Sequence, residues 1–305
     1  MGQTVAARAL LFPQRPGPMG CRWDSVVSSA VDYFDAIVLG VVEGLTEFLP
    51  VSSTGHLTIA EKLLGLDVDD PAVTGYTAVI QMGAIAAVIV YFAKDIWNII
   101  RAWTLGLVKS EYRGQLDHRM GWYVIVATIP VGVIGLLARD LITGVLRSLW
   151  VVAVALIAWS LVMWLAERVA RQDRTDRDLG IVDSILIGLA QAVALIPGVS
   201  RSGATISVGL FRGLDRVTAT KLSFFMSIPA LLAAGLFQLE DALSGDIALG
   251  VAFVGVAVAF VVAYASIAWL LRFVAHHSVA WFVPYRVGLG VLLLVLLGTG
   301  VLAPT

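Results

Sequence analysis

The sequence predicts an all-α polytopic membrane protein with six transmembrane helices plus two re-entrant helix-loop-helix hairpins in an inverted-topology repeat. Three observations predict this fold. Of the 305 residues, 59% are hydrophobic and only 14% are charged, whereas about a quarter of the residues of a soluble domain are charged. Apolar segments of membrane-spanning length recur along the chain. Two shorter apolar segments are interrupted, and the basic residues favour certain loops.

Composition also limits the partners. The net charge is −1 and no run of Lys and Arg resembles a nucleic-acid patch, so we expect the lipid bilayer and no nucleic acid as partner. Cys21 is the single cysteine, so it can form no internal disulfide. Residues 1–30 contain arginines, a cluster of prolines and one short apolar run, so we interpret them as a disordered N-terminal extension, with Met19 as an alternative start. Residues 31–305 are expected to form a single transmembrane domain.

Six segments are long and apolar enough to cross a bilayer, which takes about 20 residues of helix. They are Val73–Ala93, Gly121–Ala138, Ser148–Ala166, Val217–Leu239, Leu249–Leu271 and Val283–Leu302.

Two further apolar segments are too short to span comfortably and run into Pro and small polar residues. The first continues into a short helical stretch and makes a hairpin over about residues 35–65; the second makes a hairpin over about residues 183–213. Non-helical backbone at membrane depth is tolerated only where it is buried in protein or lines a watery cavity. A helix that enters the membrane, turns and leaves on the same side satisfies this requirement.

The two hairpins resemble copies of each other. A shift of 148 positions, which takes Ile37 to Ile185, superimposes small and apolar residues and places Glu43 on Gln191, an isostere. The other matched pairs are Gly40 with Gly188, Val51 with Val199, Ser52 with Ser200 and Gly55 with Gly203. Paired interrupted segments in two halves of a membrane protein indicate a site at the interface between the halves.

The distribution of Lys and Arg predicts how the hairpins enter. The loops that follow Ala93 and Ala166 are basic, whereas the stretch before Val73 and the loop after Leu239 are acidic and carry no basic residue. Basic loops are cytoplasmic. Six spans threaded accordingly bring the first hairpin in from outside and the second from inside, which is an inverted repeat with a site that opens to the external side.

Glu43 and Glu47 are four residues apart, so they lie on one helix face. Carboxylates in an apolar helix are costly and indicate function by default. They could bind a hard divalent cation (Mg or Ca) together with phosphate oxygens, or one could act as a general base. The alternative is an interfacial amphipathic helix with solvated carboxylates, for which the apolar neighbours leave little polar face.

The loop after Glu47 supplies three hydroxyls and an imidazole, from Ser52, Ser53, Thr54 and His56. Such hydroxyls often only cap a helix. Three are more than one cap needs, and a hydroxyl nucleophile requires a neighbouring base, which Glu47 or His56 could provide. His56 could also attack phosphorus itself.

The second loop has the composition of a phosphate-binding loop. Arg201 presents a planar fork that matches phosphate oxygens, glycines allow close approach of the backbone, and a helix N-terminus follows. The other candidate phosphate-binding residues here are Gly198, Ser200, Ser202, Gly203 and Thr205. The alternative for Arg201 is an ion pair with Glu43 or Glu47, which is compatible with a site. Arg286, in the last span, either faces phosphate or anchors the helix at the interface.

Two motifs carry a resemblance to a known family. The segment from Glu43 to His56, EGLTEFLPVSSTGH, resembles the first signature of the bacterial undecaprenyl-diphosphate phosphatases, the bacitracin-resistance family, and PGVSRSGAT from Pro197 to Thr205 resembles the second. The resemblance covers about residue 35 to the C-terminus; the extension before it departs from the family pattern.

The resemblance implies divalent-cation-assisted hydrolysis of undecaprenyl diphosphate to the monophosphate, which recycles the carrier lipid of peptidoglycan synthesis in the bacterial cytoplasmic membrane and confers bacitracin resistance. It places Glu43, Glu47, Ser53, His56 and Arg201 in the catalytic site. We prefer Ser53 as nucleophile with His56 as proton shuttle; His56 or water as nucleophile stays open.

A transporter or polyprenyl-phosphate flippase is the rival hypothesis, because broken helices in inverted repeats are typical of secondary transporters. The carboxylate–hydroxyl–histidine cluster discriminates, since hydrolysis needs a nucleophile and a base whereas transport needs only a binding site. The sequence also leaves a homodimer open.

Overall fold

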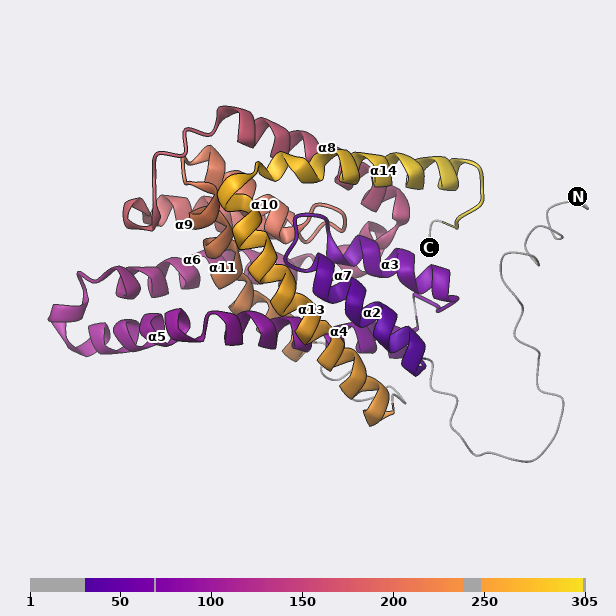
Figure 1. Ribbon diagram of the computed structural model, residues 1–305, viewed down its shortest axis with the longest axis horizontal. Helices are drawn as coiled ribbons and strands as arrows, with labels where there is room; N and C mark the ends of the chain where they lie inside the picture. The colour runs from indigo at the N-terminus through magenta and orange to yellow at the C-terminus, as the bar shows by residue number, and fades with distance from the viewer. Residues whose placement is uncertain (1–30, 69, 238–247, 304–305) are drawn as a thin grey trace, which may run out of the picture.

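The computed structural model describes residues 31–68, 70–237 and 248–303. The N-terminal extension predicted for residues 1–30 lies outside the described residues. In the described part, helices and turns make up the structure, and a single isolated β-bridge pairs Arg174 with Leu214. Figure 1 shows most of the long helices running roughly side by side, with α8 and α14 along one edge and α5 and α6 along the opposite one.

All six predicted spans are helices long and apolar enough to cross a membrane. Their bounds are α4 (Pro71–Tyr91), α6 (Leu116–Leu137), α8 (Leu149–Val169), α11 (Arg216–Phe237), α13 (Leu249–His276) and α14 (Val283–Gly298), which reaches span length together with the 3-10 turn Val279–Phe282 before it. The ends lie within about five residues of the prediction, because hydropathy locates the apolar centre of a span better than its capped ends. The fold is therefore an all-helical, multi-pass membrane protein.

The segment after Ala93, which we took for a basic loop, is instead the helix α5 (Ala93–Val108). Figure 1 shows α5 continuing α4 almost end to end. The segment is amphipathic: Ile96 and Ile99 pack against the core, whereas most of its charged residues are exposed. Trp103 lies against Gly121 of α6, where an added Cβ would come 2.8 Å from the indole ring. Its charged residues led us to predict a loop and concealed the helix.

Four shorter helices form two pairs where the hairpins were predicted. They are α2 (Tyr33–Thr46) with α3 (Ser53–Leu64), and α9 (Ile181–Val193) with α10 (Arg201–Phe211). A short α7 (Arg139–Thr143) precedes α8. α2 packs against α13, and α9 packs against α6. Each contact depends on a glycine: an added Cβ at Gly40 would lie 2.8 Å from the carbonyl oxygen of Gly255, and one at Gly188 would lie 2.5 Å from that of Ala127.

Side-chain oxygens hold the start of both first helices. Asp32 accepts hydrogen bonds from the backbone N–H groups of Phe34 and Asp35, which caps α2. In the first turn of α9, outside the six membrane-crossing helices, Asp183 forms ion pairs with Arg174 at 2.7 Å and Arg212 at 2.6 Å. Burial opposes its ionisation, but these two guanidiniums and a backbone N–H outweigh that cost and lower the pKa of Asp183 to about 2. The charged carboxylate thus ties the segment before α9 to the end of α10.

The largest cluster of buried apolar residues lies beside the turn between α2 and α3. Phe48, in that turn, meets Phe224 of α11 edge to face with ring centroids 5.2 Å apart. Phe92 meets Phe225 at 5.1 Å in the same way. Aromatic pairs of this geometry contribute roughly 0.5–1.5 kcal/mol beyond area burial. They hold α4 and α11 against the turn that carries the first motif.

Candidate active site

The turns of the two helix pairs lie side by side in the interior (Figure 1) and hydrogen-bond to each other. Ser202 Oγ donates to the Leu49 carbonyl at 2.9 Å. The backbone N–H of Gly198 donates to Ser52 Oγ at 3.1 Å. Residues that are about 150 positions apart in the sequence are therefore brought together, at the place where the paired motifs predict a site.

Two serines at matched positions share an uncommon backbone conformation. Ser52 has φ +78° and Ser200 has φ +76°, and each immediately precedes the second helix of its pair. A positive φ on a residue with a Cβ is strained and persists only where the surroundings enforce it. Both hydroxyls accept backbone hydrogen bonds, Ser52 from Gly198 and Ser200 from Gly203 at 3.2 Å. These serines shape the loops, although both also line the pocket described next.

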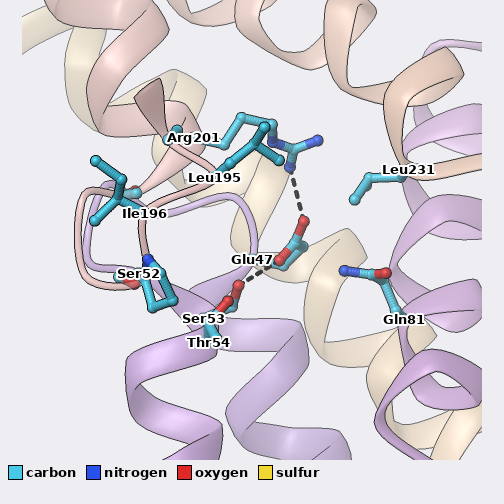
Figure 2. A pocket seen from close by; sticks show the side chains of 12 residues that line it. Glu47, Ser52, Ser53, Thr54, Gln81, Leu195, Ile196, Arg201 and Leu231 are labelled. Carbon is cyan, nitrogen blue, oxygen red and sulfur yellow. Dashed lines mark hydrogen bonds and ion pairs between the residues drawn. The ribbon is translucent and has the colours of Figure 1, made fainter. Parts of the chain in front are cut away.

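Glu47 connects the two motifs through its carboxylate (Figure 2). Ser53 Oγ donates to Glu47 Oε2 at 2.5 Å, and Arg201 Nη2 donates to Glu47 Oε1 at 2.8 Å. Glu47 is 7% exposed and follows the last turn of α2, whereas Ser53 and Arg201 open the next helices. A hydroxyl held on a carboxylate beside a guanidinium is the arrangement of a nucleophile, its base and an anion-binding group.

A pocket of about 140 Å³ opens beside this triad. The lining residues are Glu47, Ser52, Ser53, Thr54, Gln81, Ala194, Leu195, Ile196, Pro197, Ser200, Arg201 and Leu231. A pocket of this size suits a small polar headgroup and not a long lipid tail. Its wall is polar on the side of the triad and apolar at Leu195, Ile196 and Leu231.

Glu43 lies one turn before Glu47, is 1% exposed, and neither of its carboxylate oxygens has a hydrogen-bond partner among the described residues. Arg201 Nη1 is also buried without a partner there. Within the described ranges, no three His, Cys, Asp or Glu side chains gather in a group that could hold a metal ion. A hard cation fits Glu43 and Glu47 only if phosphate oxygens supply further ligands.

His56 is not placed at the pocket wall. Its Nδ1 lies 2.7 Å from the Ser52 carbonyl oxygen and its Nε2 lies 2.6 Å from the hydroxyl of Tyr285, with the two rings stacked at 5.6 Å. Because both ring nitrogens form hydrogen bonds, His56 links the loop between α2 and α3 to Tyr285 of α14. A proton shuttle at the phosphate, which we predicted, needs a rearrangement of these contacts.

Arg286 does not line the pocket, and the structure gives its guanidinium partners within the chain, so its predicted role at the phosphate stays a prediction. The side chain is fully buried. Its guanidinium donates to the carbonyls of Pro50 at 2.9 Å, Gly198 at 2.9 Å and Val199 at 3.0 Å, and its Nε donates to Ser160 Oγ at 3.1 Å. Arg286 thus fastens the two turns together.

Several predicted phosphate-binding groups have internal roles. Thr54 is an exception, because it lines the pocket. The backbone N–H of Gly203 donates to Ser200 Oγ, and Thr205 Oγ donates to the hydroxyl of Ser223 at 2.7 Å. Neither residue lines the pocket. Gly198 and Ser202 join the loops, as described above. Of the predicted phosphate-binding residues in the second motif, Ser200 and Arg201 line the pocket.

Proteins of known family share the sequence of this chain over most of its length. The sequence profile described as "Bacitracin resistance protein BacA" matches residues 36–292. The chain belongs to this family. Undecaprenyl-diphosphatase of Acidothermus cellulolyticus is 56% identical over 87% of this chain and 96% of its own length. Undecaprenyl-diphosphatase 1 of Streptomyces coelicolor is 58% identical, over 90% and 99%.

One pocket residue of this BacA-family chain escaped the sequence reasoning. Gln81 lies in α4, far from both motifs in sequence, and its amide points into the pocket (Figure 2). The available signal was a lone amide within an apolar span, since polar residues inside the membrane are costly and rarely neutral. This signal is weaker than that of the paired carboxylates Glu43 and Glu47.

Gly198→Ala is expected to destabilise this family member by about 2–3 kcal/mol and to lower its activity. Gly198 has φ +97°, and an added Cβ would lie 2.4 Å from the Val152 carbonyl oxygen of α8. A left-handed conformation alone costs a residue with a Cβ about 1–2 kcal/mol. Thermal unfolding in detergent measures the change. Gly132→Ala in α6, where nothing lies within 4 Å, is the control and should not destabilise; equal stabilities for both variants would contradict the prediction.

Proposed function

We infer that this protein hydrolyses undecaprenyl diphosphate to undecaprenyl phosphate and inorganic phosphate, and that it thereby recycles the cell-wall carrier lipid and confers resistance to bacitracin. The names of its relatives and of its family support this reaction. The observation that carries it is the 2.5 Å hydrogen bond from Ser53 to Glu47 beside Arg201, because hydrolysis needs an activated nucleophile and transport does not.

The geometry supports the following sequence of events. Glu47 accepts the proton of Ser53 as Oγ attacks the terminal phosphorus. The new O–P bond forms as the bridging P–O bond breaks, and undecaprenyl phosphate leaves. Glu47 gives up its proton to the departing phosphate. Water then attacks the phosphorus of the phosphoserine with Glu47 again as base, the Oγ–P bond breaks, inorganic phosphate leaves and Glu47 returns the proton to Ser53 Oγ. Arg201 binds phosphate oxygens and stabilises the charge in the transition state. A bound Mg or Ca ion at Glu43 and Glu47 would add charge neutralisation.

We further propose that the α2–α3 and α9–α10 pairs are re-entrant hairpins of an inverted repeat. α2 packs on α13, the second membrane-crossing helix after α10, and α9 packs on α6, the second membrane-crossing helix after α3. The first helix of each pair therefore lies against the other half. The shared φ of Ser52 and Ser200 supports the same symmetry. With the Lys and Arg distribution, this favours a site that opens to the outside of the bacterial cytoplasmic membrane. A homodimer stays a prediction.

Phosphate release from undecaprenyl diphosphate by the purified protein in detergent tests the proposal. We expect turnover that EDTA reduces and Mg or Ca restores. Ser53→Ala should lose at least about a hundredfold in rate, and a trapped phosphoserine in the wild type would confirm the nucleophile. Thr58→Val, one turn further along α3 and outside the pocket, is the matched control and should keep its rate.

Substrate binding without phosphate release would overturn the proposal and favour a flippase, because broken helices are also typical of transporters. Substantial turnover by Ser53→Ala would leave hydrolysis standing but make water or His56 the attacking group.

A further inference from the structure

Gln81 lies on the opposite side of the pocket from the catalytic triad. It comes from the middle of α4, and Leu231 of α11 lies beside it (Figure 2). Glu47 and Arg201 form the facing side. A headgroup that occupies the pocket must therefore fit between the charged triad and this neutral amide.

Tight contacts fix the rotation of α4 and hence the direction of Gln81. An added Cβ at Gly83 would lie 2.3 Å from the Val256 carbonyl oxygen of α13, so α4 and α13 touch backbone to backbone there. Met82 lies against Gly235 of α11, where an added Cβ would come 2.3 Å from its methyl group. Successive helical residues are about 100° apart. Gln81 therefore lies about 100° around α4 from the side that faces α11 and about 160° from the side that faces α13, and these two contacts keep it directed at the pocket.

The Gln81 amide is free to bind a ligand. Within the described part of the chain it makes no hydrogen bond, although the side chain is half buried. An amide in an apolar helix is costly unless it is paired. The amide faces the pocket, where a phosphate oxygen would pair with its N–H₂ group.

We propose that Gln81 binds the diphosphate headgroup by donating a hydrogen bond to a non-bridging oxygen from the side opposite Arg201. This rests on the proposed function and adds a contact from a third element outside both motifs. A neutral donor holds the anion without weakening the ion pair between Arg201 and Glu47. Gln81 is therefore a substrate-binding residue that orients the headgroup toward Ser53.

The relative activities of two variants of Gln81 test the proposal. Gln81→Leu removes the donor and should lower kcat/KM for undecaprenyl diphosphate roughly ten- to a hundredfold, the loss expected for one hydrogen bond to a charged group. Gln81→Glu keeps the shape but places a carboxylate against phosphate, so it should be worse than Gln81→Leu at pH 7.5. Thr77→Val, one turn earlier on α4 and outside the pocket, should stay within about twofold of wild type.

Thermal unfolding of each variant separates binding from folding, and Gln81→Glu, an isostere, keeps the test open if Gln81→Leu does not fold. If Gln81→Glu is more active than Gln81→Leu, the position only requires polarity and the proposal fails. The proposal also fails if wild type and Gln81→Leu turn over equally. Absence of turnover in wild type and Thr77→Val would instead refute the proposed hydrolysis itself.

Discussion

Glu47→Gln is expected to reduce phosphate release roughly a thousandfold, within the hundred- to ten-thousandfold range for loss of a general base. The isosteric amide keeps the volume of the carboxylate but cannot take the proton of Ser53, which lies 2.5 Å from Glu47 Oε2. It also removes the charge that holds Arg201 at 2.8 Å. Release of inorganic phosphate under saturating substrate measures the rate.

The coupling between Glu47 and Ser53 gives this prediction a second test. Residues that act as a unit are non-additive, so the double variant Glu47→Gln, Ser53→Ala should be no slower than the slower single variant. Glu61→Gln, at a buried carboxylate outside the pocket, is the matched control and should stay near wild type. Additive losses in the double variant, or a Glu47→Gln rate above a tenth of wild type, would show that Glu47 does not act on Ser53.

Hydropathy and breaker residues predict most of this fold. The six spans are confirmed, because a helix in lipid must be apolar over its whole length and this leaves a long signal. The two short helix pairs begin and end within a few residues of the prediction, since Pro and Ser interrupt each apolar run. α5 was missed because its charges resemble those of a loop, and an amphipathic helix is recognised by periodicity rather than by charge count.

Some residues of the candidate site can be predicted from the sequence, whereas the contacts between them cannot. Buried carboxylates and an arginine are costly in an apolar setting, so Glu43, Glu47 and Arg201 were conspicuous. Which side chains meet is decided by packing that no local pattern encodes. His56 turns to Tyr285 and Gln81 joins from a distant helix, as the interhelical contacts require. The sequence thus identifies the groups, and the tertiary structure pairs them.

Arg286→Leu is expected to cost about 3–5 kcal/mol of stability, because it removes the donor that pairs several buried carbonyl groups. The guanidinium serves carbonyls from both turns, at Pro50, Gly198 and Val199. Each buried carbonyl left unpaired costs roughly 1–3 kcal/mol. The thermal unfolding midpoint in detergent should therefore fall by roughly 10 °C, and the activity of the remaining folded protein should also fall because the turns separate.

Two variants distinguish this role from direct contact with phosphate. Arg286→Lys retains the positive charge but lacks the fork that reaches two turns, so it should recover little stability. Arg272→Leu, at an exposed arginine of α13, should leave the midpoint nearly unchanged. A variant of Arg286 that unfolds at the wild-type temperature yet is inactive would return this residue to the phosphate. The predicted result instead means that α14, through Arg286, holds the two motifs in position against each other.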